Sequence, residues 1–148
     1  MLRTIFSLIA GLFVTMLVIT GVELLSMKLY PAPAGFDWTD KQALADFVAN
    51  MSMPAMLLIV SGWCLGAFLG AAVPAWQADH RRTAALLIGL LVAVATIVNA
   101  RKVAHPQWML IAGTAGPILL AWLATRWVRA RILPPAPPSE WPEQSSSR

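Results

Sequence analysis

The chain has 148 residues, of which 58% are hydrophobic and only 12% are charged. A water-soluble domain of this size needs more charged surface than that, so the composition excludes an ordinary soluble protein and predicts an integral membrane protein. The formal net charge is +4, but the Lys and Arg residues lie at the ends of apolar segments and in the C-terminal stretch. They form no soluble basic face, so we expect no nucleic-acid partner.

The first apolar segment covers residues 4–25 and contains one charged residue, Glu23. About 20 apolar residues suffice for a helix to cross the hydrocarbon of a bilayer. The segment is longer than the apolar region of a signal peptide, and no cleavage pattern of small residues follows it. We therefore predict a retained transmembrane helix.

A long loop follows over residues 27–52 and opens with the stretch Tyr30-Pro31-Ala32-Pro33-Ala34-Gly35, which precludes a regular helix. Thr39 and Gln42 then have the spacing of a capping box and predict a short helix over residues 40–51. Its apolar residues share one face, so we expect it to be amphipathic and to lie on the membrane surface. These residues are Ala43, Leu44, Phe47, Val48 and Met51.

Three further apolar segments predict transmembrane helices over residues 54–76, 83–100 and 106–127. Pro117 should kink the last of them, because proline lacks the N–H that the helix needs and clashes with the preceding turn. The expected fold is an all-α membrane protein over residues 1–131, a four-transmembrane-helix bundle with a short amphipathic helix in its first, outer loop. Residues 132–148 are rich in Pro and Ser and predict a disordered cytoplasmic tail.

The distribution of Lys and Arg predicts the orientation in the membrane. Six lie on the side of the N-terminus and four on the other side, which favours both termini in the cytoplasm. The first set is Arg3, Arg81, Arg82, Arg126, Arg129 and Arg131, and the second is Lys28, Lys41, Arg101 and Lys102. The arginines that precede the tail are expected to lie against anionic lipid head groups.

Small residues recur at intervals of four in three of the predicted helices, which lets a neighbouring helix approach closely. The positions are Gly62, Gly66 and Gly70 in the second helix, Gly11 with Ser7 and Thr15 in the first, and Gly89 with Ala85 and Ala93 in the third. Tight packing within one bundle and packing between copies of the chain both explain this pattern.

Glu23 is the only acidic residue inside a predicted span, and a charge in lipid is costly enough that it usually faces protein or water. With the predicted topology, several polar and aromatic residues reach the same outer face: Glu23, Tyr30, Asn99, His105 and Trp108. A carboxylate beside a histidine can bind a polar head group, hold a proton or support acid–base chemistry. The same residues can also form a hydrogen-bonded clamp that fixes the Pro-rich loop.

No metal or other cofactor is expected. Cys64 is the single cysteine, and the two histidines, His80 and His105, are predicted on opposite faces of the membrane. The sequence contains no phosphate-binding loop, zinc-protease signature or serine nucleophile motif.

The chain resembles a group of small bacterial inner-membrane proteins with four spans, to which no reaction or ligand is assigned. The resemblance rests on Gly21-Val22-Glu23, the stretch from Tyr30 to Gly35, Gly66-Ala67-Phe68-Leu69-Gly70, and Asn99 with His105-Pro106-Gln107-Trp108. It extends from about Gly21 to Trp127, and Ala104 departs from it where a proline is expected. The resemblance implies a location in the bacterial inner membrane.

Three functions remain open. The first is a structural, accessory or self-associating membrane protein, with a homo-oligomer or another membrane protein as partner. The second is a small transporter or ligand-binding carrier that uses Glu23 and His105. The third is a membrane-embedded enzyme acting on lipid head groups or quinones, which would need an open cleft at the polar cluster.

Overall fold

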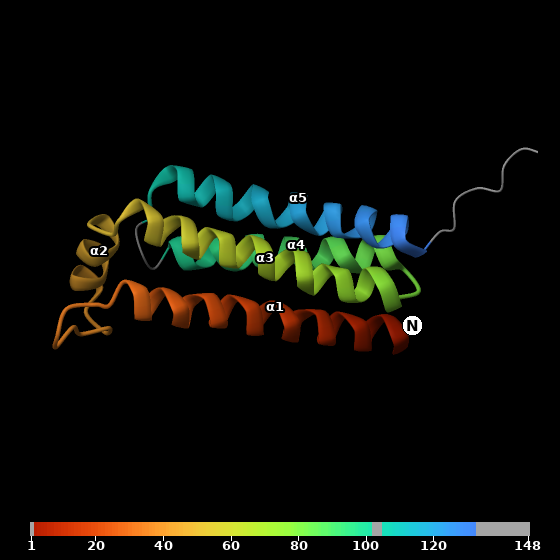
Figure 1. The fold of residues 1–148 in the computed structure, drawn as a ribbon, viewed down its shortest axis with the longest axis horizontal. Helices are drawn as coiled ribbons and strands as arrows, with labels where there is room; N and C mark the ends of the chain where they lie inside the picture. Colours follow the sequence, from red (N-terminus) through yellow and green to blue (C-terminus); the bar gives the residue numbers. More distant parts are fainter. Residues whose placement is uncertain (1, 102–104, 133–148) are drawn as a thin grey trace, which may run out of the picture.

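The computed structural model describes residues 2–101 and 105–132, and these form five helices without a strand (Figure 1). The helices are α1 (Leu2–Leu29), α2 (Lys41–Ala49), α3 (Met53–Gln77), α4 (Arg81–Ala100) and α5 (Gln107–Ile132). All except α2 are long and apolar enough to cross a membrane, with a mean hydropathy of 1.5 to 2.4 over their most apolar windows. The chain is therefore an all-α, multi-pass membrane protein.

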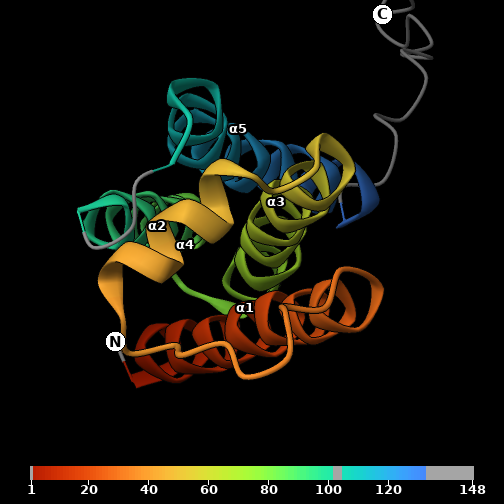
Figure 2. The same ribbon diagram turned by 90° about the vertical axis from the view of Figure 1, so that its left-hand side faces the viewer.

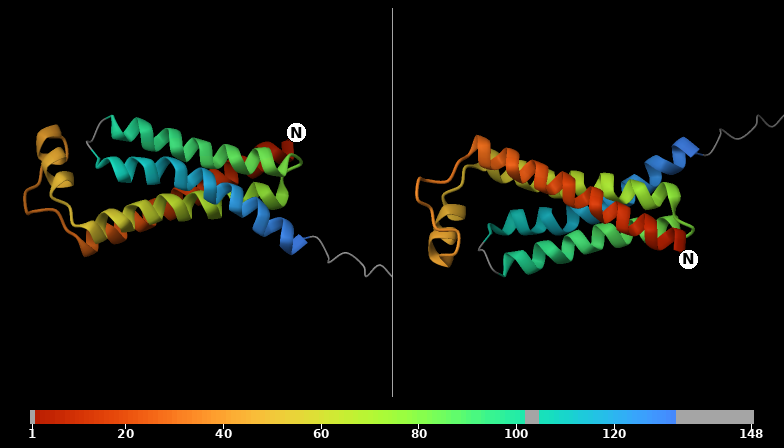
Figure 3. Two further views of the ribbon diagram at one scale, coloured as in Figure 1. Left: turned by 90° about the horizontal axis from the view of Figure 1, so that it is seen from above. Right: turned by 90° about the horizontal axis from the view of Figure 1, so that it is seen from below.

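The four long helices lie side by side and alternate in direction along the chain (Figures 1 and 3). One end of the bundle, called here the α2 end, carries the end of α1, the helix α2, and the start of α5. The opposite end, called the N-terminal end, carries the start of α1, the α3–α4 turn and the end of α5. Figure 2 shows that α2 lies across the α2 end of the bundle.

Helix α1 packs mainly on α3, and glycines allow the two backbones to come close. A Cβ atom added to Gly70 would lie 2.6 Å from the Gly11 carbonyl oxygen, and one added to Gly66 would lie 2.8 Å from Ile19. Gly62 is equally close to Val22. The glycine face of α3 is therefore packed against α1 of the same chain.

Only one narrow face of α1 is buried, and it consists of Ser7, Gly11, Thr15 and Ser26. Most of its large apolar side chains point outward; Phe6 is 67% and Phe13 is 65% exposed. Lipid is the solvent that such a surface requires. Helix α1 is thus an outer helix of the bundle.

The interior is narrow at the N-terminal end and wider at the α2 end. The first core cluster consists mostly of alanines around Ile88: Ala71, Ala75, Ala85, Ala121, Ala124 and Val128. The second, nearer the α2 end, contains larger side chains: Met56, Val60, Trp63, Ala67, Val92 and Met109. Figure 3 shows the α1–α3 pair diverging from the α4–α5 pair toward the α2 end.

Helix α4 packs against α5 through the third group of small residues. A Cβ atom added to Gly89 would lie 2.6 Å from Ala121 and 2.8 Å from the Pro117 carbonyl oxygen. Helix α5 continues through Pro117, and its axis changes direction about halfway along its length, as expected of a proline kink (Figure 3). Helix α3 likewise continues through a proline, Pro74.

Two of the long helices end several residues beyond the predicted bounds. Helix α1 ends at Leu29 rather than near residue 25, and α5 ends at Ile132 rather than near residue 127. The last turns contain Lys28 in α1, and Arg129 and Arg131 in α5. Basic side chains interact favourably with the negative end of a helix dipole and can extend to water, so these charges do not end the helix. Lys102, Ala104 and the predicted tail from residue 133 onward lie outside the described residues.

The predicted capping box at Thr39 is wrong. Asp40 is the N-cap of α2, and its Oδ1 accepts hydrogen bonds from the backbone N–H groups of Gln42 at 2.8 Å and Ala43 at 3.4 Å. The Thr39 hydroxyl and N–H donate instead to Oδ1 of Asp37, at 2.7 and 2.8 Å. The carboxylates of Asp37 and Asp40 carry a full negative charge, which the Thr39 hydroxyl lacks. They are therefore the stronger hydrogen-bond acceptors for these donors.

Candidate functional site

A cavity of about 560 Å³ lies at the α2 end, between the bundle and the loop that contains α2. Four of the five residues of the predicted polar cluster line it: Glu23, Tyr30, Asn99 and His105. Glu23 and Tyr30 are about 70 or more residues away in sequence from Asn99 and His105, so only the fold brings the two pairs together. The fifth residue, Trp108, is half-buried and packs against the core cluster around Trp63.

The roof of this cavity is built by the loop and α2. Gly35 adopts a φ of +78°, which favours glycine, and the N–H of Phe36 donates to the Pro33 carbonyl at 3.1 Å. This turn brings Phe36 to Trp38 and Phe47, with ring centroids 4.8 and 5.1 Å away. All three rings line the cavity, so we call them the aromatic roof.

The apolar face of α2 is turned toward the cavity. Leu44, Phe47, Val48 and the following Met51 all line it, and Val48 is buried. The apolar face that the sequence predicts for this helix therefore lines the cavity at the end of the bundle.

Trp63 forms the floor of the cavity and was not predicted as a site residue. It is only 8% exposed, and its ring lies against α5 at Gly113, where an added Cβ atom would be 2.7 Å from the ring. Its ring centroid is 6.2 Å from that of His105. In the sequence alone, a tryptophan in an apolar span indicates only packing. No sequence pattern therefore identified Trp63 as a site residue.

The Glu23 carboxyl has Trp63 as its hydrogen-bonding neighbour. Its side chain remains exposed, and within the described residues no cationic side chain pairs with it. Glu23 lies six residues before the end of α1, which places it about 9 Å along the helix from that end.

A second cavity of about 600 Å³ lies between α1 and α4, beside Trp63 of α3. We call it the α1–α4 groove. Its lining is mostly apolar and includes Leu12, Met16, Ile19, Leu91 and Ala95. The groove extends over about 16 Å of α1, from Leu12 to Glu23.

The polar side chains along this groove already have partners. The Thr15 hydroxyl donates to the Gly11 carbonyl at 2.9 Å, and the Thr96 hydroxyl donates to the Val92 carbonyl at 3.0 Å. Both bonds stay within one helix, as is common for threonine in apolar surroundings. The groove therefore offers an apolar surface until it reaches Glu23.

Three residues line both cavities: Glu23, Trp63 and Asn99. The cavity beneath the aromatic roof, called here the roofed cavity, and the α1–α4 groove are thus adjacent at these side chains. Both have mostly apolar linings, and Glu23 is the acidic residue that lines each of them. An elongated molecule with one polar end could contact both.

The described residues contain no group of three or more His, Cys, Asp or Glu residues that could hold a metal ion. His80 and His105 lie at opposite ends of the bundle, His80 before α4 and His105 before α5. What the site provides is a carboxylate, an amide, a phenol, an imidazole and an indole around one cavity, which suits hydrogen bonding and proton exchange.

Comparisons of the chain with protein-family models, with curated proteins and with solved structures found no match.

Proposed function

We propose that this protein is a membrane carrier that binds an amphipathic molecule with a cationic, hydrogen-bond-donating head group. In this proposal the head group lies at Glu23 beneath the aromatic roof, and the hydrocarbon chain lies in the α1–α4 groove. The observation that supports it most directly is that Glu23, Trp63 and Asn99 line both cavities.

The charge of the head group follows from Glu23. A carboxylate inside a span is unfavourable unless a partner compensates it, and no cation of the described residues does so. A ligand ammonium group would form a charge-assisted hydrogen bond with this carboxylate. Asn99 and Tyr30 can accept further hydrogen bonds from such a group.

The hydrophobic part of the ligand follows from the groove. Ligand sites are typically concave, mostly apolar and equipped with a few convergent polar groups. The groove supplies the apolar wall, and its opening between α1 and α4 lets a chain enter from the lipid without crossing water. The ligand would then exchange with the bilayer rather than with the aqueous phase.

We further propose that the protein resides in the bacterial inner membrane with both termini in the cytoplasm, so that the α2 end faces outward. The excess of basic residues at the N-terminal end supports this orientation. The resemblance to small four-span bacterial proteins supports the choice of membrane. Surface labelling of a single cysteine introduced at Trp38, after Cys64→Ala, tests the orientation in intact cells.

The alternative of a self-associating protein needs small-residue faces that are free for a second chain. Gly62, Gly66 and Gly70 instead meet α1 of the same chain, and Gly89 meets α5. This packing weighs against the glycine pattern as an interface between copies. A structural or accessory role that uses other surfaces stays an alternative to the carrier.

The carrier proposal is tested by photo-cross-linking in vesicles. The probe is a long-chain alkylammonium ion with a photoreactive diazirine near the end of its chain, and its control is the alkyl sulfate with the same chain. We expect the ammonium probe to label groove residues such as Met16 and Leu91. Glu23→Gln should weaken its binding by roughly 10- to 100-fold, since a hydrogen bond to a charged group contributes about 1.5–3 kcal/mol.

Asp46→Asn is the matched control, because it removes an acid at the same end of the bundle that does not line the roofed cavity. It should leave probe binding unchanged. Equal labelling by the ammonium and sulfate probes, or unchanged binding after Glu23→Gln, would contradict the proposal.

A further inference from the structure

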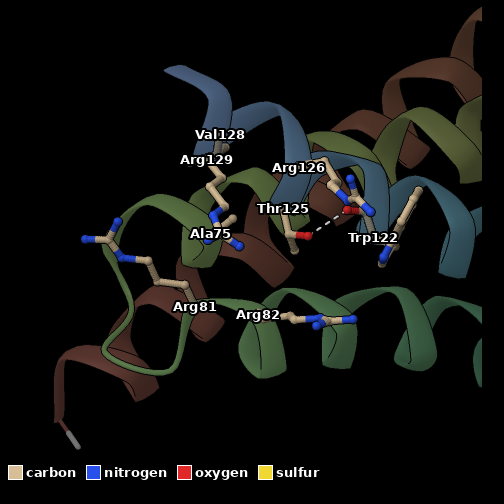
Figure 4. A pocket seen from close by; sticks show the side chains of 8 residues that line it. All are labelled: Ala75, Arg81, Arg82, Trp122, Thr125, Arg126, Val128 and Arg129. Carbon is tan, nitrogen blue, oxygen red and sulfur yellow. Dashed lines mark hydrogen bonds between the residues drawn. The ribbon is translucent and has the colours of Figure 1, made fainter. Parts of the chain in front are cut away.

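A cavity of about 570 Å³ lies at the N-terminal end of the bundle, among α3, α4 and α5 (Figure 4). We call it the arginine pocket. Four arginines line it: Arg81 and Arg82 from the first turn of α4, and Arg126 and Arg129 from the last turns of α5. The other lining residues are Ala75, Trp122, Thr125 and Val128, so none of the lining residues is acidic.

The four arginines place four positive charges on the lining of one cavity, and like charges repel one another unless an anion lies between them. Figure 4 shows the Arg81 side chain extending away from Ala75 and from the other three arginines. The start of α4 adds to the positive potential, because the N-terminus of a helix carries a partial positive charge. Asp79 is the acidic residue described nearest to this end of the bundle, and its Oδ2 accepts a hydrogen bond from Thr4 of α1 at 3.4 Å. No carboxylate among the described residues lines the pocket to neutralise it.

Part of the pocket is held in place by local contacts. The Arg126 guanidinium lies over the Trp122 ring at 4.7 Å, a cation–π contact. The Thr125 hydroxyl donates to the Trp122 carbonyl at 2.7 Å (Figure 4). Figure 4 also shows Arg82 extending toward the side where Trp122 and Arg126 lie, while Arg129 leans over Ala75.

The arginine pocket is apolar at its base and positively charged at its rim. Its base contains buried Ala75 and Val128, and Trp122 is 37% exposed beside it. Its rim carries the arginines. A tryptophan and arginines at the end of a transmembrane helix are typical of the region where lipid head groups lie.

We infer that the arginine pocket binds the phosphate group of an anionic phospholipid. Guanidinium groups match phosphate oxygens in pairs, and arginines from α4 and α5 would contact the same phosphate from two sides. The apolar base would receive the glycerol and upper acyl part of the lipid. Arg131, expected from the sequence to meet head groups together with its neighbours, does not line the pocket and lies over Trp127 instead. The site is independent of the cavity at the α2 end.

Native mass spectrometry of the full chain in neutral detergent tests this inference, with phosphatidylglycerol and phosphatidylcholine as competing probes. We expect a preference for phosphatidylglycerol. Arg82→Gln with Arg126→Gln should lower the affinity for phosphatidylglycerol by roughly 25-fold, because each basic residue near a lipid phosphate contributes about 1 kcal/mol. Phosphatidylcholine should lose less affinity, because its choline ammonium group offsets the charge of its phosphate.

The control variant, Arg101→Gln with Arg131→Gln, removes the same charge outside the pocket. If it lowers the affinity as much as the pocket variant does, the attraction is a diffuse surface charge and the inference is overturned. If millimolar inorganic phosphate binds and displaces the lipid, the site serves a free anion, which also overturns it. Should the double variant not fold, Arg82→Lys keeps the charge but removes the paired donors, and a loss of several-fold is then expected.

Discussion

The ring centroids of Trp63 and His105 lie 6.2 Å apart, with an angle of 59° between the ring planes. Because Trp63 comes from α3 and His105 from the segment before α5, this contact joins two elements at the base of the roofed cavity. On the far side of these rings lie Met109 and Leu110, around a space too small for water. Trp63 therefore packs toward Met109 and Leu110 on one side, and its other side faces the cavity that Glu23 also lines.

Gly113→Ala should displace Trp63. The added methyl group would lie 2.7 Å from the indole ring and 2.9 Å from Thr96, so the ring must move toward the cavity. Overpacking of this kind lowers the free energy of unfolding by about 1–3 kcal/mol. Thermal unfolding in detergent measures the loss, and alkylammonium binding should weaken because Trp63 fills part of the site.

Gly70→Ala should separate α1 from α3. Its Cβ atom would meet the Thr15 hydroxyl and the Gly11 carbonyl oxygen, and a backbone group cannot rotate away. We expect a loss of at least about 2 kcal/mol in the free energy of unfolding. Gly21→Ala is the control for both glycine variants, because nothing lies within 4 Å of its added atom. That control should be neutral or slightly stabilising, since alanine favours helix over glycine by about 1 kcal/mol.

Ala95→Phe should block the α1–α4 groove. Ala95 lines the groove, whereas the neighbouring Val94 does not line it and is 47% exposed. Phenylalanine at position 95 should therefore reduce cross-linking by the alkylammonium probe at Met16 and Leu91, while Val94→Phe should leave it unchanged. Equal effects of the two variants would show that the chain of the probe does not lie in the groove.

Phe36→Ala should loosen the aromatic roof. It removes the contacts of this ring with Trp38 and Phe47, and each such aromatic pair contributes about 0.5–1.5 kcal/mol. Amide hydrogen exchange in α2 should become faster, while exchange in α4 should not change. Trp76→Ala, which removes an exposed aromatic ring at the opposite end, should leave α2 protected.

The loop before α2 should respond to acid. Hydrogen bonds from the hydroxyl and backbone N–H of Thr39 lower the pKa of Asp37, and a bond from the backbone of Asp40 adds to this effect. Because the folded pKa lies below the unfolded one, the stabilisation is present above about pH 4 and is lost as the pH falls through the lowered value. Thr39→Val should raise the pKa of Asp37 toward its ordinary value, which an NMR titration of the carboxyl carbon measures. An unchanged pKa would contradict the assigned hydrogen bonds.

The sequence was sufficient to predict four apolar helices and one short helix in the first long loop. Hydropathy, length and the position of Pro54 encode these elements locally, so no tertiary information is needed. The helix ends were less accurate at Leu29 and Ile132, because basic residues there end the apolar segment without ending the helix.

The candidate site was predictable only in part. Glu23, Tyr30, Asn99 and His105 line one cavity because helices that alternate in direction return their ends to the same side. Trp63 and the α1–α4 groove depend on how far the helices diverge and on the gap that Gly113 leaves. Such distances between helices are not encoded by the periodicity of a single segment.

The unequal lengths of the long helices bear on how the protein fits bilayers of different thickness. Helix α4 has 20 residues and spans about 30 Å, close to the hydrocarbon of a typical bilayer, whereas the 28 residues of α1 span about 42 Å. Since the two helices differ by about 12 Å, α1 must tilt or protrude when α4 matches the hydrocarbon. A thicker membrane would draw the end of α1, and Glu23 with it, deeper into the acyl chains.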